Sequence, residues 1–225
     1  MDAAVQTWNL TKRYEELVAV DRLNLTVNKG EIFGLLGPNG AGKTTTILML
    51  MGLTEPTSGQ ARVYGYDPIR EPLRVKRLAG YLAENFGFYE DLTAEQNLSY
   101  IARLNGIPFN EAKEKIYDLL DLVGLSDVAE MEVSKFSRGM KQRLGMADIL
   151  LKNPEVLFLD EPTAGIDPEG VRRILDIIVK LSREDGKTIL VSSHLLYQVQ
   201  RICDRVGIFV KGRMVAEGPI QRLGR

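Results

Sequence analysis

The sequence predicts an α/β fold with a mainly parallel sheet, an antiparallel β part near the N-terminus and an inserted block of helices. Short β-rich segments alternate with helical segments over most of the chain, as expected of strands joined by helices. The runs at 32–36 and 156–159 are continuously apolar, which is typical of strands buried on both faces of a sheet. From 84 to 151 the segments become helical, so a helical block interrupts the α/β part instead of following it.

Composition indicates a globular chain with no surplus of positive charge. Its 225 residues suffice for one large domain or two small ones, and no repeat or linker divides them. Lysine and arginine total 29 against 30 aspartate and glutamate, and this balance disfavours nucleic acid as a partner. The single Cys203 cannot form an intramolecular disulfide, which favours a reducing compartment, and we expect it to be buried in a helix.

No segment of the sequence predicts secretion or membrane insertion. The N-terminus lacks the basic and apolar regions of a signal peptide. The longest apolar runs are far shorter than the roughly 20 residues that a membrane-spanning helix needs. If the function involves a membrane, another chain must cross it.

Further strands are expected on both sides of the helical block. Leu23, Leu25 and Val27 alternate with polar residues, which predicts a half-exposed, antiparallel edge strand. Buried strands are expected at 79–82 and 188–192, and a short β-like pair near the C-terminus. This last pair is centred on Ile208 and Met214.

Three helices are expected within the block. Thr93 and Gln96 form a capping-box pattern for a helix that reaches Leu104. Asn110 is the expected cap of the second helix, which Gly124 ends, and Ser137 is the expected cap of the third. The residues spaced for burial on the last two helices are Ile116, Leu119, Leu120, Val123, Met140, Leu144, Ala147 and Leu151.

A glycine-rich loop provides the first chemical signal. Residues 37–44 match the pattern G-x-x-x-x-G-K-[S/T], between a buried strand and an apolar helix. Glycines let the backbone turn its N–H groups toward phosphate oxygens, Lys43 adds positive charge, and the Thr44 hydroxyl can ligate Mg²⁺. A glycine-rich turn without a ligand is disfavoured by the full spacing. The expected nucleotide-binding residues are Gly37, Pro38, Asn39, Gly40, Ala41, Gly42, Lys43, Thr44 and Thr45.

Two carboxylates end the buried strand at 156–159. Asp160 is placed to hold Mg²⁺ directly or through water. Glu161 is placed to act as a general base on an attacking water, which favours hydrolysis over binding alone. A polar loop that merely caps a core strand is the alternative.

The segment 136–143, Phe-Ser-Arg-Gly-Met-Lys-Gln-Arg, resembles the LSGGQ signature of ABC ATPases. The order and spacing of the other motifs resemble that family too. The resemblance implies that Tyr14 stacks on adenine and that Asp167 belongs to the D-loop, with Asp167 before Pro168 also a good helix cap. It implies that His194, the only histidine, meets the γ-phosphate. Tyr14 as a packing aromatic and His194 as a helix-start residue are the alternatives.

The family resemblance implies a single ABC ATPase domain with a P-loop NTPase core. Residues 1–84 and 152–225 would form the nucleotide-binding α/β core and β subdomain, and 85–151 the helical subdomain with the signature. Two chains would dimerise head to tail on ATP, and the signature of one would close over the other's ATP. The signature residues implied to meet the partner's ATP are Ser137, Arg138, Gly139 and Met140.

The resemblance also implies a membrane partner. ATP and Mg²⁺ would be the ligands, and the chain would lie in the cytoplasm, on the inner face of the membrane beneath an integral permease. Aromatic residues at 86, 88 and 89 would transmit motion to that permease, or simply pack the helical subdomain. A DNA-repair or translation ABC ATPase is disfavoured by the short insert and single cassette. A GTPase is disfavoured by the lack of an Asn-Lys-x-Asp motif, and a small-molecule kinase by the signature.

Two departures from the family pattern stand out. The signature has Phe136, Arg138 and Met140 where the family has Leu, Gly and Gln, and such variants resemble the drug- and antibiotic-exporter branch. The family's Q-loop glutamine, a metal-shell residue, is replaced by Glu84, and a one-residue realignment would put Asn85 there instead. The metal set implied by the resemblance is Thr44, Asp160 and Glu84.

Overall fold

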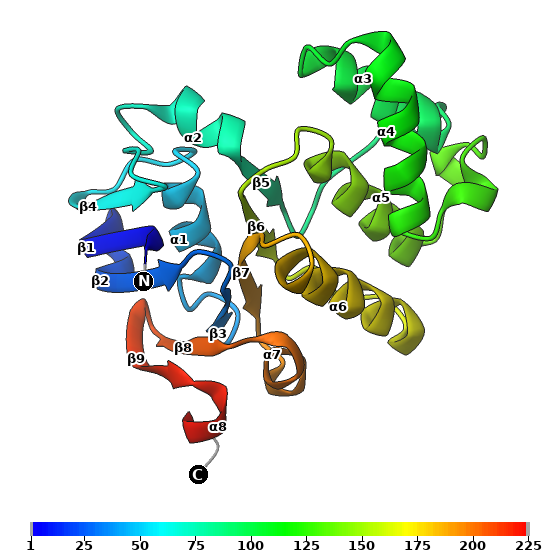
Figure 1. Cartoon of the computed structure of the whole chain (residues 1–225). Coiled ribbons are helices and arrows are strands. Elements are labelled where there is room, and N and C mark those ends of the chain that lie inside the picture. Colours follow the sequence, from blue (N-terminus) through cyan, green and yellow to red (C-terminus); the bar gives the residue numbers. More distant parts are fainter. Residues whose placement is uncertain (1, 224–225) are drawn as a thin grey trace.

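The computed structural model describes residues 2–223 and contains two β-sheets with helices around and between them (Figure 1). The smaller sheet has the strand order β2-β1-β4 and the larger sheet the order β5-β6-β7-β3-β8-β9. The strands are β1 (Ala3–Tyr14), β2 (Leu17–Asn28), β3 (Ile32–Leu36), β4 (Ser58–Val63), β5 (Ala79–Leu82), β6 (Val156–Asp160), β7 (Thr188–Ser193), β8 (Arg205–Val210) and β9 (Arg213–Pro219).

The smaller sheet is antiparallel throughout, and β2 lies at its edge. The side chains of Leu23, Leu25 and Val27 are buried, and the residues between them are exposed. This alternation confirms the half-exposed edge strand predicted from the sequence.

In the larger sheet, β5, β6, β7, β3 and β8 run parallel, and β9 pairs antiparallel with β8. All residues of β6 and β7 are buried, as expected of strands covered on both faces. The strands at 32–36, 79–82, 156–159 and 188–192 are therefore confirmed. The carboxyl ends of β3, β6 and β7 meet at one edge, which is where open α/β sheets bind ligands.

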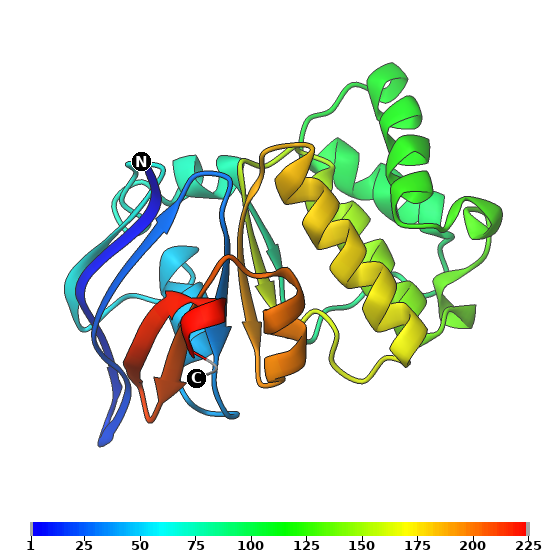
Figure 2. The same cartoon turned by 60° about the horizontal axis from the view of Figure 1, so that its bottom comes forward.

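The helices α3, α4 and α5 gather in a separate part of the molecule, beyond the β5 edge of the larger sheet (Figures 1 and 2). Among the described residues, no helix has the length and apolar character needed to span a membrane. The α-helices are α1 (Lys43–Leu50), α2 (Pro72–Leu78), α3 (Ala94–Leu104), α4 (Phe109–Leu122), α5 (Arg138–Leu150), α6 (Pro168–Arg183), α7 (Leu196–Ile202) and α8 (Ile220–Leu223). Two short 3₁₀ helices lie at Ser126–Val128 and Val133–Lys135.

Most of the expected helix caps are present. Thr93 and Gln96 form a reciprocal capping box on α3, and the Ser137 hydroxyl accepts a hydrogen bond from the Met140 N–H. The prediction for Asn110 was wrong, because α4 begins before it and Asn110 lies within the first turn. Instead, the carbonyl of Pro108 accepts the N–H groups at 111 and 112, so the helix begins without a side-chain cap.

Two buried clusters hold these layers together. The first packs α1 between the smaller sheet and the larger one, and contains the fully buried rings of Phe33, Phe158 and Phe209 (Figure 1). The second joins α3, α4 and α5 to α6, α7 and the opposite face of the larger sheet. Burial of one large apolar side chain contributes roughly 1.5–3 kcal/mol to the stability of the fold. Because the second cluster is continuous, such contacts attach the helical part firmly to the sheet.

Candidate functional site

The phosphate loop leaves the carboxyl end of β3 and enters α1 at Gly42. Gly42 has a φ of 104°, and a Cβ there would lie 2.3 Å from the Ala19 carbonyl oxygen. A Cβ at Gly37 would lie 2.4 Å from the Phe209 carbonyl oxygen. The two glycines thus let the loop pass against neighbouring backbone while it curls over the start of α1, which carries the positive end of the helix dipole.

Lys43 is buried beneath this loop. Its ammonium group donates to the carbonyl oxygens of Gly37 and Pro38, at 2.7 and 3.2 Å. The same nitrogen lies 3.3 Å from Oε1 of Glu161, and both side chains are more than 90% buried. The cation is therefore fixed at the loop, with a carboxylate directly beside it.

Asp160 and Glu161 lie where β6 ends, and Ser192 of the neighbouring strand β7 connects them. The Ser192 hydroxyl donates to Oδ1 of Asp160 at 2.5 Å and accepts the N–H of Glu161 at 3.0 Å. Glu161 has a φ of +47°, a left-handed backbone that costs a non-glycine residue about 1–3 kcal/mol. Such strain is typical of functional sites, and here it turns the Glu161 side chain toward Lys43.

His194 follows β7 and contacts the Glu161 carboxylate through Oε2, whereas Lys43 lies beside Oε1. Its Nδ1 lies 2.9 Å from Oε2 of Glu161. A carboxylate only accepts hydrogen bonds, so the pair requires a proton on Nδ1 and leaves Nε2 free to interact elsewhere. The helix α7 begins only at Leu196, and the N–H of Leu195 is accepted by the Ser193 hydroxyl, so the imidazole is not needed as a cap.

A pocket of about 350 Å³ lies above the phosphate loop and contains most of the expected nucleotide-binding residues. Tyr14 lines it with a ring that is 45% exposed, and the Lys12 ammonium lies 4.8 Å from the ring centroid. Tyr14 is thus an open aromatic face and not a core residue. Glu84 lines the same pocket with Glu161, whereas Asn85 is not among the lining residues.

The signature residues lie apart from this pocket and beside the D-loop. A Cβ at Gly139 would lie 3.7 Å from Oδ1 of Asp167, and one at Gly165 would lie 2.7 Å from the Arg138 guanidinium. Asp167 caps α6 by accepting the N–H groups of Glu169 and Gly170, as predicted, and hydrogen bonding, chiefly from Gly170, lowers the Asp167 pKa. One chain therefore carries two surfaces of different chemistry, a phosphate pocket and a signature face, at different places.

The residues of the pocket fit a nucleotide with a divalent cation. Oε1 of Glu161 is buried and has no hydrogen bond among the described residues, and Lys43 contacts it only as an ion pair at 3.3 Å, so a ligand that draws Lys43 to its phosphates would leave this oxygen open to a hydrogen bond. The Thr44 hydroxyl and the Glu84 carboxylate line the pocket, and Asp160 lies behind it. Within 2–223, no cluster of three or more His, Cys, Asp or Glu side chains could hold a metal without a substrate. Hard cations favour these oxygen ligands, and the nucleotide phosphates would add more.

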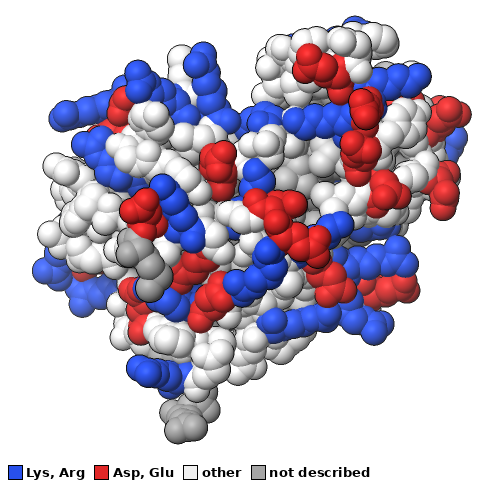
Figure 3. All heavy atoms as spheres, in the orientation of Figure 1, with Lys and Arg blue, Asp and Glu red and all other residues white. Residues whose placement is uncertain are grey.

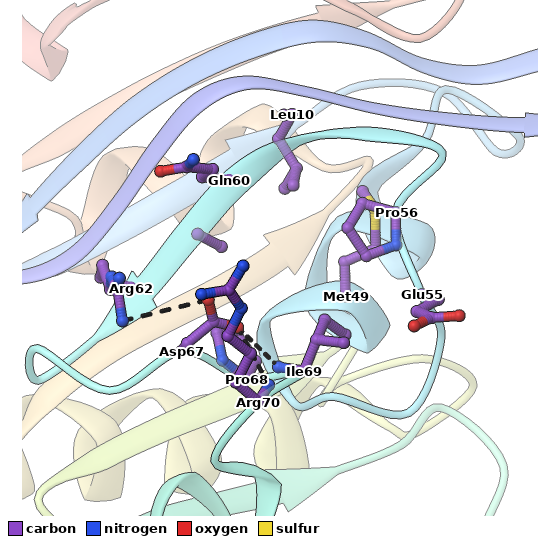
Figure 4. A pocket seen from close by; sticks show the side chains of 12 residues that line it. Leu10, Met49, Glu55, Pro56, Gln60, Arg62, Asp67, Pro68, Ile69 and Arg70 are labelled. Carbon is purple, nitrogen blue, oxygen red and sulfur yellow. Dashed lines mark hydrogen bonds and ion pairs between the residues drawn. The ribbon is translucent and has the colours of Figure 1, made fainter.

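A second cavity of about 250 Å³ lies between β4 and the end of α1 (Figure 4). Two of its charged groups are paired within the chain: Asp67 accepts the N–H groups of Ile69 and Arg70, and lies 3.9 Å from Arg62. None of the phosphate-loop residues lines this cavity, so it is not part of the nucleotide pocket.

A glycine-rich loop between a central parallel strand and a helix, with a carboxylate pair after a nearby strand, defines a P-loop nucleotide-binding protein. A family model described as "ABC transporter" matches residues 20–164. The chain belongs to the ABC transporter ATP-binding family.

Relatives from bacteria match almost the whole chain. The bacitracin transport ATP-binding protein BcrA of Bacillus licheniformis is 44% identical over 99% of this chain and 72% of its own length. The linearmycin resistance ATP-binding protein LnrL of Bacillus subtilis is 39% identical over 95% of this chain and 68% of its own. The solved structure of cbiO1 from Clostridium perfringens is 26% identical, with a TM-score of 0.89 over 100% of this chain and 91% of that one.

The structure brings most of the predicted site residues together and adds one that was not predicted. Tyr14, the loop 37–45, Glu84, Asp160, Glu161 and His194 are brought together, and the signature and Asp167 form the second surface. The role of Ser192 as the link between Asp160 and Glu161 was not predicted. Its only signal was a polar residue at the end of an apolar strand. Of the aromatic residues at 86, 88 and 89, Phe86 and Phe88 pack on the core, while Tyr89 is 57% exposed. Their part in transmitting motion stays a prediction.

Proposed function

We propose that this chain hydrolyses ATP in a head-to-tail dimer and thereby powers export by a separate membrane permease. The observation that supports hydrolysis most strongly is the buried Lys43–Glu161 pair at the edge of the phosphate pocket, with the 40% exposed His194 side chain in contact with Glu161. A pocket that only binds phosphate needs Lys43 but has no use for a buried carboxylate held by an imidazole.

The residues of this chain divide the chemistry among them. Glu161 accepts a proton from the attacking water, and His194 orients the carboxylate and offers Nε2 to the γ-phosphate. Lys43 and the loop N–H groups stabilise the negative charge on the phosphates. Thr44, Asp160 and Glu84 are the residues that would hold Mg²⁺, whose charge neutralises the β- and γ-phosphates when it is bound.

Dimerisation follows from the separation of the two surfaces. The signature residues and Asp167 lie away from the chain's own pocket, so they can reach ATP only in a second copy. A structural relative, the ATP-binding cassette MJ0796, 26% identical with a TM-score of 0.84, is described as dimeric and bound to ADP and Pi. We propose the same pairing here.

The membrane partner is proposed from the family. ABC ATP-binding subunits work with permeases, and the names of the relatives refer to bacitracin transport and linearmycin resistance. We therefore propose export of an antibiotic-like compound, with the chain in the cytoplasm on the inner face of the membrane. The part at 85–151 would act as the subdomain that transmits motion to the permease.

Glu161→Gln tests the proposal. The amide keeps the size of the side chain but removes the base, so turnover should fall by at least about 100-fold, the low end for a general base. ATP binding should persist and a closed dimer should accumulate in MgATP, as seen by size-exclusion chromatography. Lys43→Ala is the control, because it should lose ATP binding and remain monomeric. A Glu161→Gln protein that binds ATP yet stays monomeric would refute the dimer.

A further inference from the structure

Helix α2 and the residues before it carry exposed cations at one end of the molecule. Arg70, Arg74 and Arg77 are exposed, whereas Val75 is fully buried in the first cluster. Residues 58–78 contain five basic and two acidic side chains, a net charge of +3, in a chain whose total is −1. Figure 3 shows lysine and arginine side chains gathered at the upper left, where Figure 1 draws α2 and β4.

Apolar side chains are exposed among these cations. Leu73 on α2 is 71% exposed, more than any other large apolar side chain of the part that the structure describes, and Leu53 after α1 is 50% exposed. A Cβ at Gly52 would lie 2.2 Å from the Pro68 carbonyl oxygen and 3.5 Å from the Cβ of Pro72, so the turn after α1 packs against the start of α2. The two leucines are therefore neighbours at one end of the molecule. We call the following set the arginine–leucine face: Leu53, Arg70, Leu73, Arg74 and Arg77.

The chain's own carboxylates do not neutralise this face. Arg74 lies 3.6 Å from Glu71 and over the ring of Tyr66, 5.3 Å from its centroid. The Arg74–Glu71 pair is open to solvent, and such pairs are weak. Within 2–223, the guanidinium groups of Arg70 and Arg77 make no ion pair and no hydrogen bond. The face is thus left with positive charge that a partner could neutralise.

The positive charge is local to this end of the α/β part. Residues 85–151 carry eleven acidic and seven basic side chains, a net charge of −4. In both views α2 lies in the upper part of the molecule, together with α3 and α4 (Figures 1 and 2). Under the proposed function the helical part meets the permease, so α2 is turned toward the same membrane.

We infer that the arginine–leucine face rests on anionic phospholipids of the cytoplasmic leaflet that surrounds the permease. This leaflet has a negative surface potential, which attracts clusters of basic side chains. The planar guanidinium groups suit headgroup phosphates, and the two leucines leave water for the region where the acyl chains begin. A nucleic acid would offer phosphates as well, but it would give the exposed leucines no apolar surroundings.

The inference rests on the proposed function, because that function brings the chain to a membrane. Three arginines and two leucines are too few to anchor a protein alone, since stable anchoring takes stronger combined signals. The lipid contact therefore orients a chain that the permease already holds. It also predicts that the lipid composition around the permease influences how the chain is positioned.

Flotation of the purified chain with lipid vesicles tests the contact without a permease. One set of vesicles contains phosphatidylcholine alone, and the other contains phosphatidylcholine and phosphatidylglycerol in equal amounts. The wild type is compared with the combined substitution Arg70→Gln, Arg74→Gln and Arg77→Gln, called the arginine variant, and with Leu73→Ser. Partition is measured over a range of lipid concentrations at low and high salt.

A second triple substitution is the matched control. Arg172→Gln, Arg173→Gln and Lys180→Gln together remove the same charge from exposed positions of α6. Ile174 of α6 lies in the second cluster, whereas Val75 of α2 lies in the first, so the two helices cover opposite faces of the larger sheet. Thermal unfolding of each variant verifies that it is folded.

We expect the wild type to prefer the anionic vesicles and the arginine variant to lose at least about tenfold in partition. Leu73→Ser should lose at least about threefold, the control less than about twofold, and high salt should weaken wild-type binding. Equal partition of the wild type and the arginine variant, or equal losses in the arginine variant and the control, would overturn the inference.

Two further outcomes separate the alternatives. Retention of the wild type on polyuridylate RNA more tightly than on anionic vesicles, with Leu73→Ser unimpaired, would assign the face to nucleic acid and overturn the inference. The proposed function is tested apart from this, by MgATP turnover and by the Glu161→Gln dimer in solution. A chain that floats with anionic vesicles but neither hydrolyses ATP nor pairs would remove the proposed function and keep the lipid contact. A chain that does both in solution but shows no lipid preference would remove only the inference.

Discussion

Replacing Ser192 by alanine tests how the two carboxylates of the site are held. The Ser192 hydroxyl is fully buried, donates to Asp160 and accepts the N–H of Glu161. Alanine removes the hydroxyl and leaves no group in its place. The buried Asp160 then loses a donor, and the Glu161 N–H loses its acceptor.

The expected cost follows from these two contacts. A hydrogen bond to an ionised group contributes about 1.5–3 kcal/mol, and a buried N–H left without a partner costs about 1 kcal/mol or more. We therefore expect Ser192→Ala to lower the free energy of unfolding by about 3 kcal/mol. For a chain of this size, each kcal/mol shifts the melting temperature by about 2–4 °C, so Tm should fall by about 6–12 °C.

Ser182→Ala is the matched control. Ser182 is also a buried serine, but its hydroxyl makes a single bond, to the neutral carbonyl of Gly30 at 2.9 Å. Its loss should cost about 1 kcal/mol. Both proteins are compared by thermal unfolding and by MgATP turnover, and only Ser192→Ala should need more Mg²⁺ for half-maximal activity. Melting of Ser192→Ala within about 2 °C of Ser182→Ala would refute the reasoning.

Three further predictions concern single side chains. His194→Ala should reduce turnover at least about tenfold in saturating MgATP with little change in nucleotide affinity; unaltered turnover would exclude His194 from the reaction. Glu84→Gln should need more Mg²⁺ for half-maximal turnover yet stay active, and Glu84→Ala still more, because hard cations prefer carboxylate oxygen; superimposable magnesium titrations would exclude Glu84 from the metal shell. Burial raises the Asp148 pKa from 3.8 to about 6, so between these values the folded chain binds a proton that the unfolded chain has lost, and the wild type loses stability as pH rises through this range. The stability of Asp148→Asn relative to wild type should therefore be about 2 kcal/mol greater at pH 7.5 than at pH 4.5, measured by urea unfolding; a pH-independent difference would contradict this.

Local patterns predicted the fold because each of its elements depends on local physics. The glycine spacing at 37–44 permits the left-handed backbone of Gly42 at the start of α1, and the capping box at Thr93 depends on four consecutive residues. The start of α4 could not be predicted in the same way. Asn110 suits a cap, but the carbonyl of Pro108 already accepts the first N–H groups.

The contacts that the sequence could not predict depend on the register of distant strands. Ser192 lies opposite Asp160 only because β6 and β7 are parallel neighbours in one register. The left-handed backbone of Glu161 and the burial that raises the Asp148 pKa likewise depend on three-dimensional packing. Patterns therefore predicted which groups gather at the pocket, but not which groups hold them in place.

In the proposed head-to-tail dimer, the separation of the phosphate pocket from the signature face would make activity depend on concentration. Two free chains meet by a bimolecular encounter, so dilution lowers the fraction of paired molecules and with it the turnover per chain. A permease that binds two chains makes the encounter intramolecular, with an effective concentration on the order of millimolar for short connections. The membrane partner would thus set the catalytic rate simply by holding the two copies within reach.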